Sequence, residues 1–212
     1  MKQLVILSGK GGTGKTTVAA ALAHLASQEL LIVLADADVD AANLELVLDP
    51  TKREKHDFTG GKLAMVDPVA LDTGAELVLV DGPPGIGCPV ISASAGADLA
   101  LHVAEPTISG AHDLECIMGT TDHFGVPSLV AVNKADLNPA RSDEIAAFCA
   151  ERGVELVGRI PYDAVVTEAM VHGRPVTDYT DGSVTEALKE MWIRIRERLF
   201  LDGKGSAVGA QR

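Results

Sequence analysis

The chain begins with a short apolar run that leads directly into a glycine-rich loop and then into a helical pattern. The apolar run spans residues 4–7, and the loop reads Gly-Lys-Gly-Gly-Thr-Gly-Lys-Thr-Thr over residues 9–17. This fits the phosphate-loop template, in which a glycine, four further residues and Gly-Lys-Thr lie between a strand and a helix. Glycines let the backbone turn its N–H groups toward phosphate oxygens, and the helix adds the positive end of its dipole. The sequence therefore predicts an α/β fold that binds a nucleotide.

The polar residues of this loop have expected roles. Lys15 is expected to reach the β- and γ-phosphates, and the hydroxyl group of Thr16 is expected to ligate Mg²⁺. The loop residues predicted to contact the nucleotide are Gly11, Gly12, Thr13, Gly14, Lys15, Thr16 and Thr17.

Composition narrows the fold class further. Hydrophobic residues make up 47% of the 212 residues but aromatic ones 3%, which indicates an aliphatic interior. Such an interior is typical of a doubly wound, mainly parallel sheet with helices on both faces. We expect one P-loop ATPase domain over residues 1–200 and a disordered tail over 201–212.

Charge and targeting signals limit the functional classes. The net charge of −12 disfavours broad binding to nucleic acid or to anionic membranes, because both need a cationic surface. The chain starts with a strand and has neither a signal peptide nor an apolar run near 18 residues, so we expect a cytoplasmic protein. Its three cysteines form no CxxC pair, and no disulfide framework is readable.

Acidic residues follow two further apolar runs. Asp36 and Asp38 come after residues 30–35, and Asp81 follows residues 77–80. A carboxylate at the end of a strand beside a phosphate loop can hold Mg²⁺ through water or orient the attacking water. Asp81 is the expected magnesium partner, and Gly85 after it can offer its N–H group to the γ-phosphate.

A second lysine in the loop, Lys10, makes the loop resemble the deviant phosphate loop of the MinD/ParA group of P-loop ATPases. The resemblance implies that Lys10 reaches across a homodimer, formed on ATP binding, to the partner's phosphates. A lysine that merely raises the local positive potential is the alternative. Asp36 and Asp38, followed by Asn43, match the first switch segment of the group. This match implies that Asp38 positions the hydrolytic water and that Asp36 supports the metal shell.

The residues expected near the nucleotide base do not distinguish adenine from guanine. Residues 133–136 read Asn-Lys-Ala-Asp, a pattern that reads guanine in GTPases. In MinD-like ATPases the same asparagine, here Asn133, contacts adenine. ATP and GTP therefore both remain open, although the deviant loop favours ATP. Pro161, after the apolar run 156–160, matches a family segment that borders the base.

Two segments resemble one branch of this group, in which a two-cluster ferredoxin module is inserted. They are residues 60–68, Gly-Gly-Lys-Leu-Ala-Met-Val-Asp-Pro, and residues 105–114, Glu-Pro-Thr-Ile-Ser-Gly-Ala-His-Asp-Leu. The eight cysteines of the module are missing here, which excludes a cluster of that kind in this chain. We expect a surface excursion over residues 50–76 at the position of the insert.

The branch implies a role for the switch. Its ferredoxin modules imply assembly, delivery or energetic coupling of a metal or iron–sulfur cluster on an unidentified partner protein. A positioning ATPase of the MinD/ParA type, a GTPase of the metallochaperone type and a biosynthetic ligase are the alternatives.

Four further residues or segments are expected to be mainly structural. Cys88 is expected to be a partly buried thiol, with a metal or cluster shared across a dimer as the alternative. His112 has no companion at ligand spacing, so a contact or capping role is expected. Cys149 is expected in the core, and the helix over residues 184–200 is expected to pack on the domain rather than grip a membrane.

Overall fold

A six-stranded parallel sheet forms the centre of the protein. The computed structural model describes residues 1–38, 44 and 74–201. Every pair of neighbouring strands is parallel, and the order across the sheet is β2-β3-β1-β4-β5-β6. This confirms the predicted doubly wound fold. The strands are β1 (Lys2–Ser8), β2 (Ile32–Asp36), β3 (Leu77–Pro84), β4 (Leu99–Ala104), β5 (Ser128–Asn133) and β6 (Glu155–Ile160).

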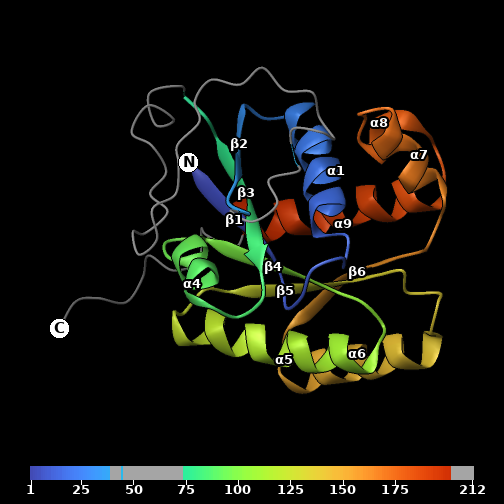
Figure 1. Ribbon diagram of the computed structural model, residues 1–212. Helices are drawn as coiled ribbons and strands as arrows, with labels where there is room; N and C mark the ends of the chain where they lie inside the picture. The colour runs from blue at the N-terminus through green and yellow to red at the C-terminus, as the bar shows by residue number, and fades with distance from the viewer. Residues whose placement is uncertain (39–43, 45–73, 202–212) are drawn as a thin grey trace.

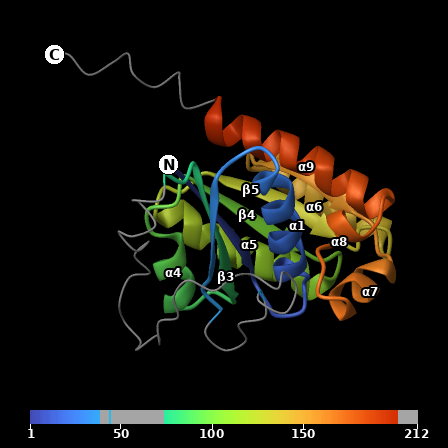
Figure 2. The ribbon, with the colours of Figure 1, turned by 90° about the horizontal axis from the view of Figure 1, so that it is seen from above.

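Helices cover both faces of the sheet (Figure 1). One face carries α1, α7, α8 and α9, and the other carries α4, α5 and α6, as the view from above also shows (Figure 2). Because successive strand side chains point to opposite faces, each face has its own aliphatic core. The helices are α1 (Lys15–Ser27), α4 (Cys88–Ser94), α5 (Ile108–His123), α6 (Pro139–Glu151), α7 (Val165–Val171), α8 (Val176–Tyr179) and α9 (Ser183–Phe200).

Alternate residues along each strand belong to different cores. In β1, Leu4 and Ile6 join the core under α1 and α9, whereas Val5 and Leu7 join the core under α4, α5 and α6. All four side chains are fully buried. The carboxyl end of β1 is thereby fixed from both sides, and the phosphate loop follows it directly.

The strand β3 is longer than the sequence predicts. Asp81 lies inside the strand rather than at its end, and the strand continues through Pro84. Its partner β2 ends at Asp36, opposite Asp81, so beyond that point β3 has a neighbour on one side alone. Prolines, which lack an N–H group, are tolerated on such a free edge. A register shift in β1 lets Ser8 pair with Pro84.

The last helix packs on the domain, as predicted. Its apolar side contributes Leu188, Met191, Trp192 and Ile195 to the core shared with α1. No helix among the described residues is long and apolar enough to cross a membrane. Most of the expected excursion over 50–76, together with Asn43 and the tail from 202, lies outside the described residues.

Candidate functional site

The phosphate loop joins β1 to α1 in a conformation that depends on glycine. Gly14, the residue before α1, has a φ of 85°, in the left-handed region. A Cβ atom there would lie 2.2 Å from the Asn133 side-chain nitrogen, so glycine is required for space as well as for conformation. The Thr13 hydroxyl group is buried without a hydrogen-bond partner among the described residues. An unpartnered buried polar group in a loop of this shape fits a site built to receive phosphate oxygens.

One carboxylate holds the two loop side chains that were predicted to serve the nucleotide. Lys15 Nζ donates to Asp81 Oδ1 at 2.5 Å, and Thr16 Oγ1 donates to Asp81 Oδ2 at 2.7 Å. Lys15 is 5% exposed and Asp81 1% exposed. Burial raises the pKa of Asp81, although the charge of Lys15 and both hydrogen bonds act in the opposite direction. The donor set, a hydroxyl group and a carboxylate beside a lysine, fits Mg²⁺ bound together with a nucleotide phosphate.

The end of β2 brings two more carboxylates to this point. Asp38 Oδ2 lies 4.0 Å from Lys15 Nζ, and the Asp38 side chain is 11% exposed. The carboxylate of Asp36 accepts the backbone N–H groups of Asp38 at 3.0 Å and of Leu44 at 3.1 Å. Burial raises the pKa of Asp36 despite these two hydrogen bonds. In this structure Asp36 therefore shapes the turn that carries Asp38 toward Lys15.

Lys10 lies on the other side of the loop and points to residues after β4. Its amine lies 3.5 Å from Glu105 Oε2 and 3.1 Å from Ser109 Oγ. The same Glu105 accepts a 2.6 Å hydrogen bond from Lys134, whose amine is also 3.5 Å from the carbonyl oxygen of Gly12. Glu105 thus links the lysines on both flanks of the phosphate loop. Its position after an apolar run predicts that Glu105 lies at the nucleotide edge of the sheet, but the sequence does not predict its pairing with the two lysines.

Residues near the predicted base site are hydrogen-bonded to the phosphate loop and to the segment after β6. Asn133 Nδ2 donates to the carbonyl oxygen of Thr13 at 2.8 Å, so this residue contacts the phosphate loop. Asp136 Oδ1 accepts the backbone N–H group of Tyr162 at 2.6 Å. This bond ties the segment after β5 to the segment after β6, where Pro161 lies. The aspartate that would read guanine in a GTPase is therefore bonded to its own chain.

The structure does not place Gly85 as expected. Its N–H group donates to the carbonyl oxygen of Ser8 at 2.9 Å, which extends the β1–β3 pairing. In this conformation it is not directed toward a phosphate. The bond follows from the same register shift that lengthens β3.

Away from the loop, the expectation for Cys88 is wrong, and His112 has a neighbour that was not predicted from the sequence. Cys88 is exposed rather than partly buried, because it begins α4 at the surface. His112 does have a companion: its Nε2 atom lies 3.8 Å from Cys116 Sγ, one turn further along α5. Cys149, in contrast, is fully buried as expected, and burial raises the pKa of its thiol to about 11.

The chain has relatives over most of its length. It is 25% identical to an uncharacterised protein of Methanocaldococcus jannaschii, over 92% of this chain and 96% of that protein. This alignment spans 277 positions, more than the 212 residues present here, so the relative carries segments that this chain lacks. It is also 28% identical to an uncharacterised ATP-binding protein of the same organism, over 91% of this chain and 86% of that protein. An iron–sulfur cluster carrier protein of Pyrococcus abyssi is 25% identical, over 93% of this chain and 86% of that protein.

Solved structures show the same fold. The septum site-determining protein MinD of Pyrococcus horikoshii, complexed with Mg-ADP, superposes with a TM-score of 0.75. The superposition covers 98% of this chain and 99% of that one, at 24% identity. A model of the CobQ/CobB/MinD/ParA nucleotide-binding domain matches residues 4–176, which include the phosphate loop and all of the sheet except the first two residues of β1. The chain therefore belongs to the CobQ/CobB/MinD/ParA family of nucleotide-binding domains.

Proposed function

We propose that the protein is a Mg²⁺-dependent ATPase that works as an ATP-driven dimer switch. The observation that carries this proposal is the carboxylate of Asp81, which holds both Lys15 and Thr16 inside the phosphate loop. A phosphate loop needs the lysine, the hydroxyl group and the carboxylate to bind Mg²⁺ and phosphate, and here the carboxylate keeps the other two in place. When bound, Mg²⁺ would neutralise charge on the β- and γ-phosphates.

The residues of the chain then have distinct tasks. With a nucleotide bound, Lys15 would exchange its bond with Asp81 for phosphate oxygens, and Asp81 and Thr16 are the residues that would hold Mg²⁺. Asp38, beside Lys15, accepts a hydrogen bond from the attacking water and so orients it. Asp36 keeps the Asp38 turn in place through its two backbone hydrogen bonds and supports the metal shell.

Lys10 is proposed to act on the nucleotide of a second copy. Its contacts in this structure are with surface groups after β4, and its side chain is 33% exposed. The pair with Glu105 is half-buried and loose, with Glu105 14% exposed and the charged atoms 3.5 Å apart, and Glu105 keeps Lys134 as a partner when Lys10 leaves. The switch is therefore dimerisation on ATP binding, followed by dissociation when the γ-phosphate is lost.

ATP is the proposed nucleotide, with GTP as the alternative. Asp136 would have to break its 2.6 Å bond with the Tyr162 N–H group before it could accept hydrogen bonds from a guanine edge. Asn133 would likewise have to leave the Thr13 carbonyl oxygen before its amide group could contact adenine, so the preference for ATP rests mainly on the resemblance of the loop to that of MinD-like ATPases. Pro161 is proposed to border the base, and Gly85 would serve the γ-phosphate only by giving up its bond with the Ser8 carbonyl oxygen.

The client of the switch is proposed to be a metal- or iron–sulfur-cluster protein. Support comes from the resemblance of residues 60–68 and 105–114 to the ferredoxin-bearing branch and from the similarity to an iron–sulfur cluster carrier protein. The acidity of the chain, with a net charge of −12, argues against a nucleic acid or an anionic membrane as the client.

Light scattering on a sizing column, combined with nucleotide binding and phosphate release, tests the switch. With Mg²⁺ and ATP the wild type is expected to become a dimer, whereas with ADP or GTP it stays monomeric. Lys10→Ala should still bind ATP but remain a monomer with phosphate release reduced at least tenfold, because the lysine acts from the partner. Lys15→Ala is the matched control and should lose nucleotide binding itself. A wild type that stays monomeric with ATP and hydrolyses GTP would overturn the proposal in favour of the GTPase.

A further inference from the structure

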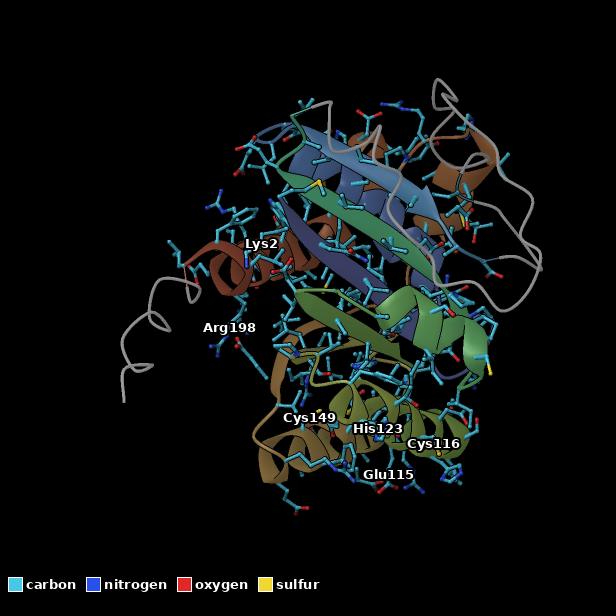
Figure 3. The ribbon with its side chains drawn as sticks, turned by 90° about the vertical axis from the view of Figure 1, so that its left-hand side faces the viewer. Lys2, Glu115, Cys116, His123, Cys149 and Arg198 are labelled. Atoms are coloured by element: carbon cyan, nitrogen blue, oxygen red, sulfur yellow. The ribbon has the colours of Figure 1, made fainter. Side chains whose placement is uncertain are left out.

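A histidine and a cysteine lie one turn apart on the outer side of α5. His112 Nε2 and Cys116 Sγ are 3.8 Å apart; His112 is exposed and Cys116 is half-buried. Figure 3 shows Cys116 and its neighbour Glu115 on α5, away from the strands. Residues four positions apart share one face of a helix, so both side chains can reach the same point in solvent.

The separation of the two atoms suits a shared cation. Zn²⁺ binds histidine nitrogen at about 2.0–2.1 Å and cysteine sulfur at about 2.3 Å, and a tetrahedral angle then places the two ligand atoms about 3.6 Å apart. The 3.8 Å in the structure is close to that value, so the helix needs no distortion to supply both ligands. Neither side chain has another polar partner within the part of the chain that the structure describes.

The surroundings leave the other coordination positions open. His112 borders a groove between α5 and α6 whose floor includes Leu114 and Phe148. The carboxylates on its rim are already paired, Glu115 with Arg152 at 3.0 Å and Glu144 with Arg141. No group of three or more histidine, cysteine or acidic side chains that could hold a metal is found among the described residues. A cation held here would therefore keep coordination positions for water or for a ligand from a partner.

We propose that His112 and Cys116 form a two-ligand site for a borderline divalent cation such as Zn²⁺, with open positions for water or for a ligand from a partner. Binding replaces the thiol proton of Cys116, which goes to solvent, by a sulfur–metal bond. The neutral imidazole of His112 supplies Nε2. This site goes beyond the proposed nucleotide switch and does not depend on it.

The helix that carries the pair also touches the phosphate loop. Asp113, the residue after His112, packs against Gly9, where a Cβ atom would lie 2.4 Å from the Asp113 Cβ. Ser109, at the start of the same helix, contacts Lys10. A cation on the outer face of α5 would thus lie one turn from residues that position the nucleotide loop.

A Co²⁺ titration of the full chain under reducing conditions tests the site, with Co²⁺ as the spectroscopic probe. The expected result is a thiolate-to-cobalt charge-transfer band that saturates at one Co²⁺ per chain and disappears when Zn²⁺ is added. Cys116→Ala should abolish the band, and His112→Asn should weaken binding at least tenfold. Cys88→Ala is the matched control, because Cys88 is an exposed thiol on another helix, α4, and this variant should keep the full band.

The opposite results are equally clear. A wild type without the band, or a band that survives in Cys116→Ala and vanishes in Cys88→Ala, would overturn the assignment. Circular dichroism of each variant separates loss of ligand from loss of fold, and Cys116→Ser serves if the alanine variant is unfolded. Phosphate release by His112→Asn should match the wild type, so failure of the metal site and failure of the nucleotide switch are distinguishable.

Discussion

Gly9 is the residue at which the phosphate loop and α5 approach most closely. Its missing side chain leaves space for the Asp113 Cβ at 2.4 Å and for the Asp113 carbonyl oxygen at 2.6 Å, measured from the place where a Cβ would stand. The second of these atoms belongs to helical backbone, which cannot move aside without shifting the helix. Gly11, two residues further on, has no atom within 4 Å of its own Cβ position and no left-handed φ.

These two glycines form a matched pair of variants. Gly9→Ala is expected to lower the free energy of unfolding by about 1–3 kcal/mol, because overpacking forces a backbone shift. For a chain of this size each 1 kcal/mol lowers Tm by about 2–4 °C. Gly11→Ala should keep the wild-type Tm in differential scanning calorimetry without nucleotide. Equal Tm values for the two variants would contradict the close contact between the loop and α5.

A buried histidine of β4 lies where this strand packs against α5. His102 is fully buried, and its Nε2 atom lies 3.0 Å from Ser128 Oγ and 3.2 Å from Thr121 Oγ1. Its Nδ1 atom has no partner among the described residues. Burial lowers the pKa of His102 from 6.5 to about 4, so the folded protein keeps this ring neutral. The packing of β4 against α5 is therefore expected to weaken at acid pH.

The sign of the pH effect follows from the lowered pKa. Below pH 6.5 the unfolded chain binds a proton at His102 that the folded chain refuses until about pH 4, so stability falls as the pH falls through this window. Between about pH 7.5 and about pH 5 this histidine should account for a loss of about 2 kcal/mol. His102→Met should remove that part of the loss, since Thr121 can still donate to the Met118 carbonyl oxygen at 3.0 Å.

Urea unfolding at the two pH values measures this difference. His123→Gln is the control, because His123 is an exposed histidine at the end of α5, the helix that packs against His102, and its replacement should leave the difference between the two pH values as in the wild type. The same loss of stability in wild type and His102→Met would show that the acid sensitivity has another source.

At the scale of the whole molecule, two cores share one sheet. Trp192, the single tryptophan, is buried in the core under α1 and α9, and Cys149 is buried in the core under α4, α5 and α6. Alternate residues of the same strands supply both cores, so neither can be lost without breaking the strands that hold the other.

Trp192 and Cys149 should therefore report unfolding of both cores at the same urea concentration. In a Cys88→Ala/Cys116→Ala background, Cys149 is the remaining thiol, and its reactivity reports on the second core. The midpoint of its exposure in urea is expected to equal the midpoint of the Trp192 fluorescence change. Separate midpoints would mean that the faces of the sheet unfold independently. Far-UV circular dichroism provides a third measure of the same transition.

The sequence by itself determined the features that depend on neighbouring residues. The phosphate loop and the bounds of α1 follow from glycine conformation and local template, and the burial of β1, β4 and β5 follows from continuous apolar runs. That Asp81 would lie near Lys15 could be predicted too, because parallel strands run toward the same edge of the sheet, although β3 continues past Asp81.

The tertiary structure decided the contacts between strand ends and helix faces that are distant in sequence. Glu105 meets Lys10 and Lys134 because β4 lies between β1 and β5. Asp136 is bonded to Tyr162 because β6 adjoins β5. The exposure of Cys88 depends on where α4 begins at the surface. No local sequence pattern predicts these contacts, since they depend on the order and register in which the strands pair.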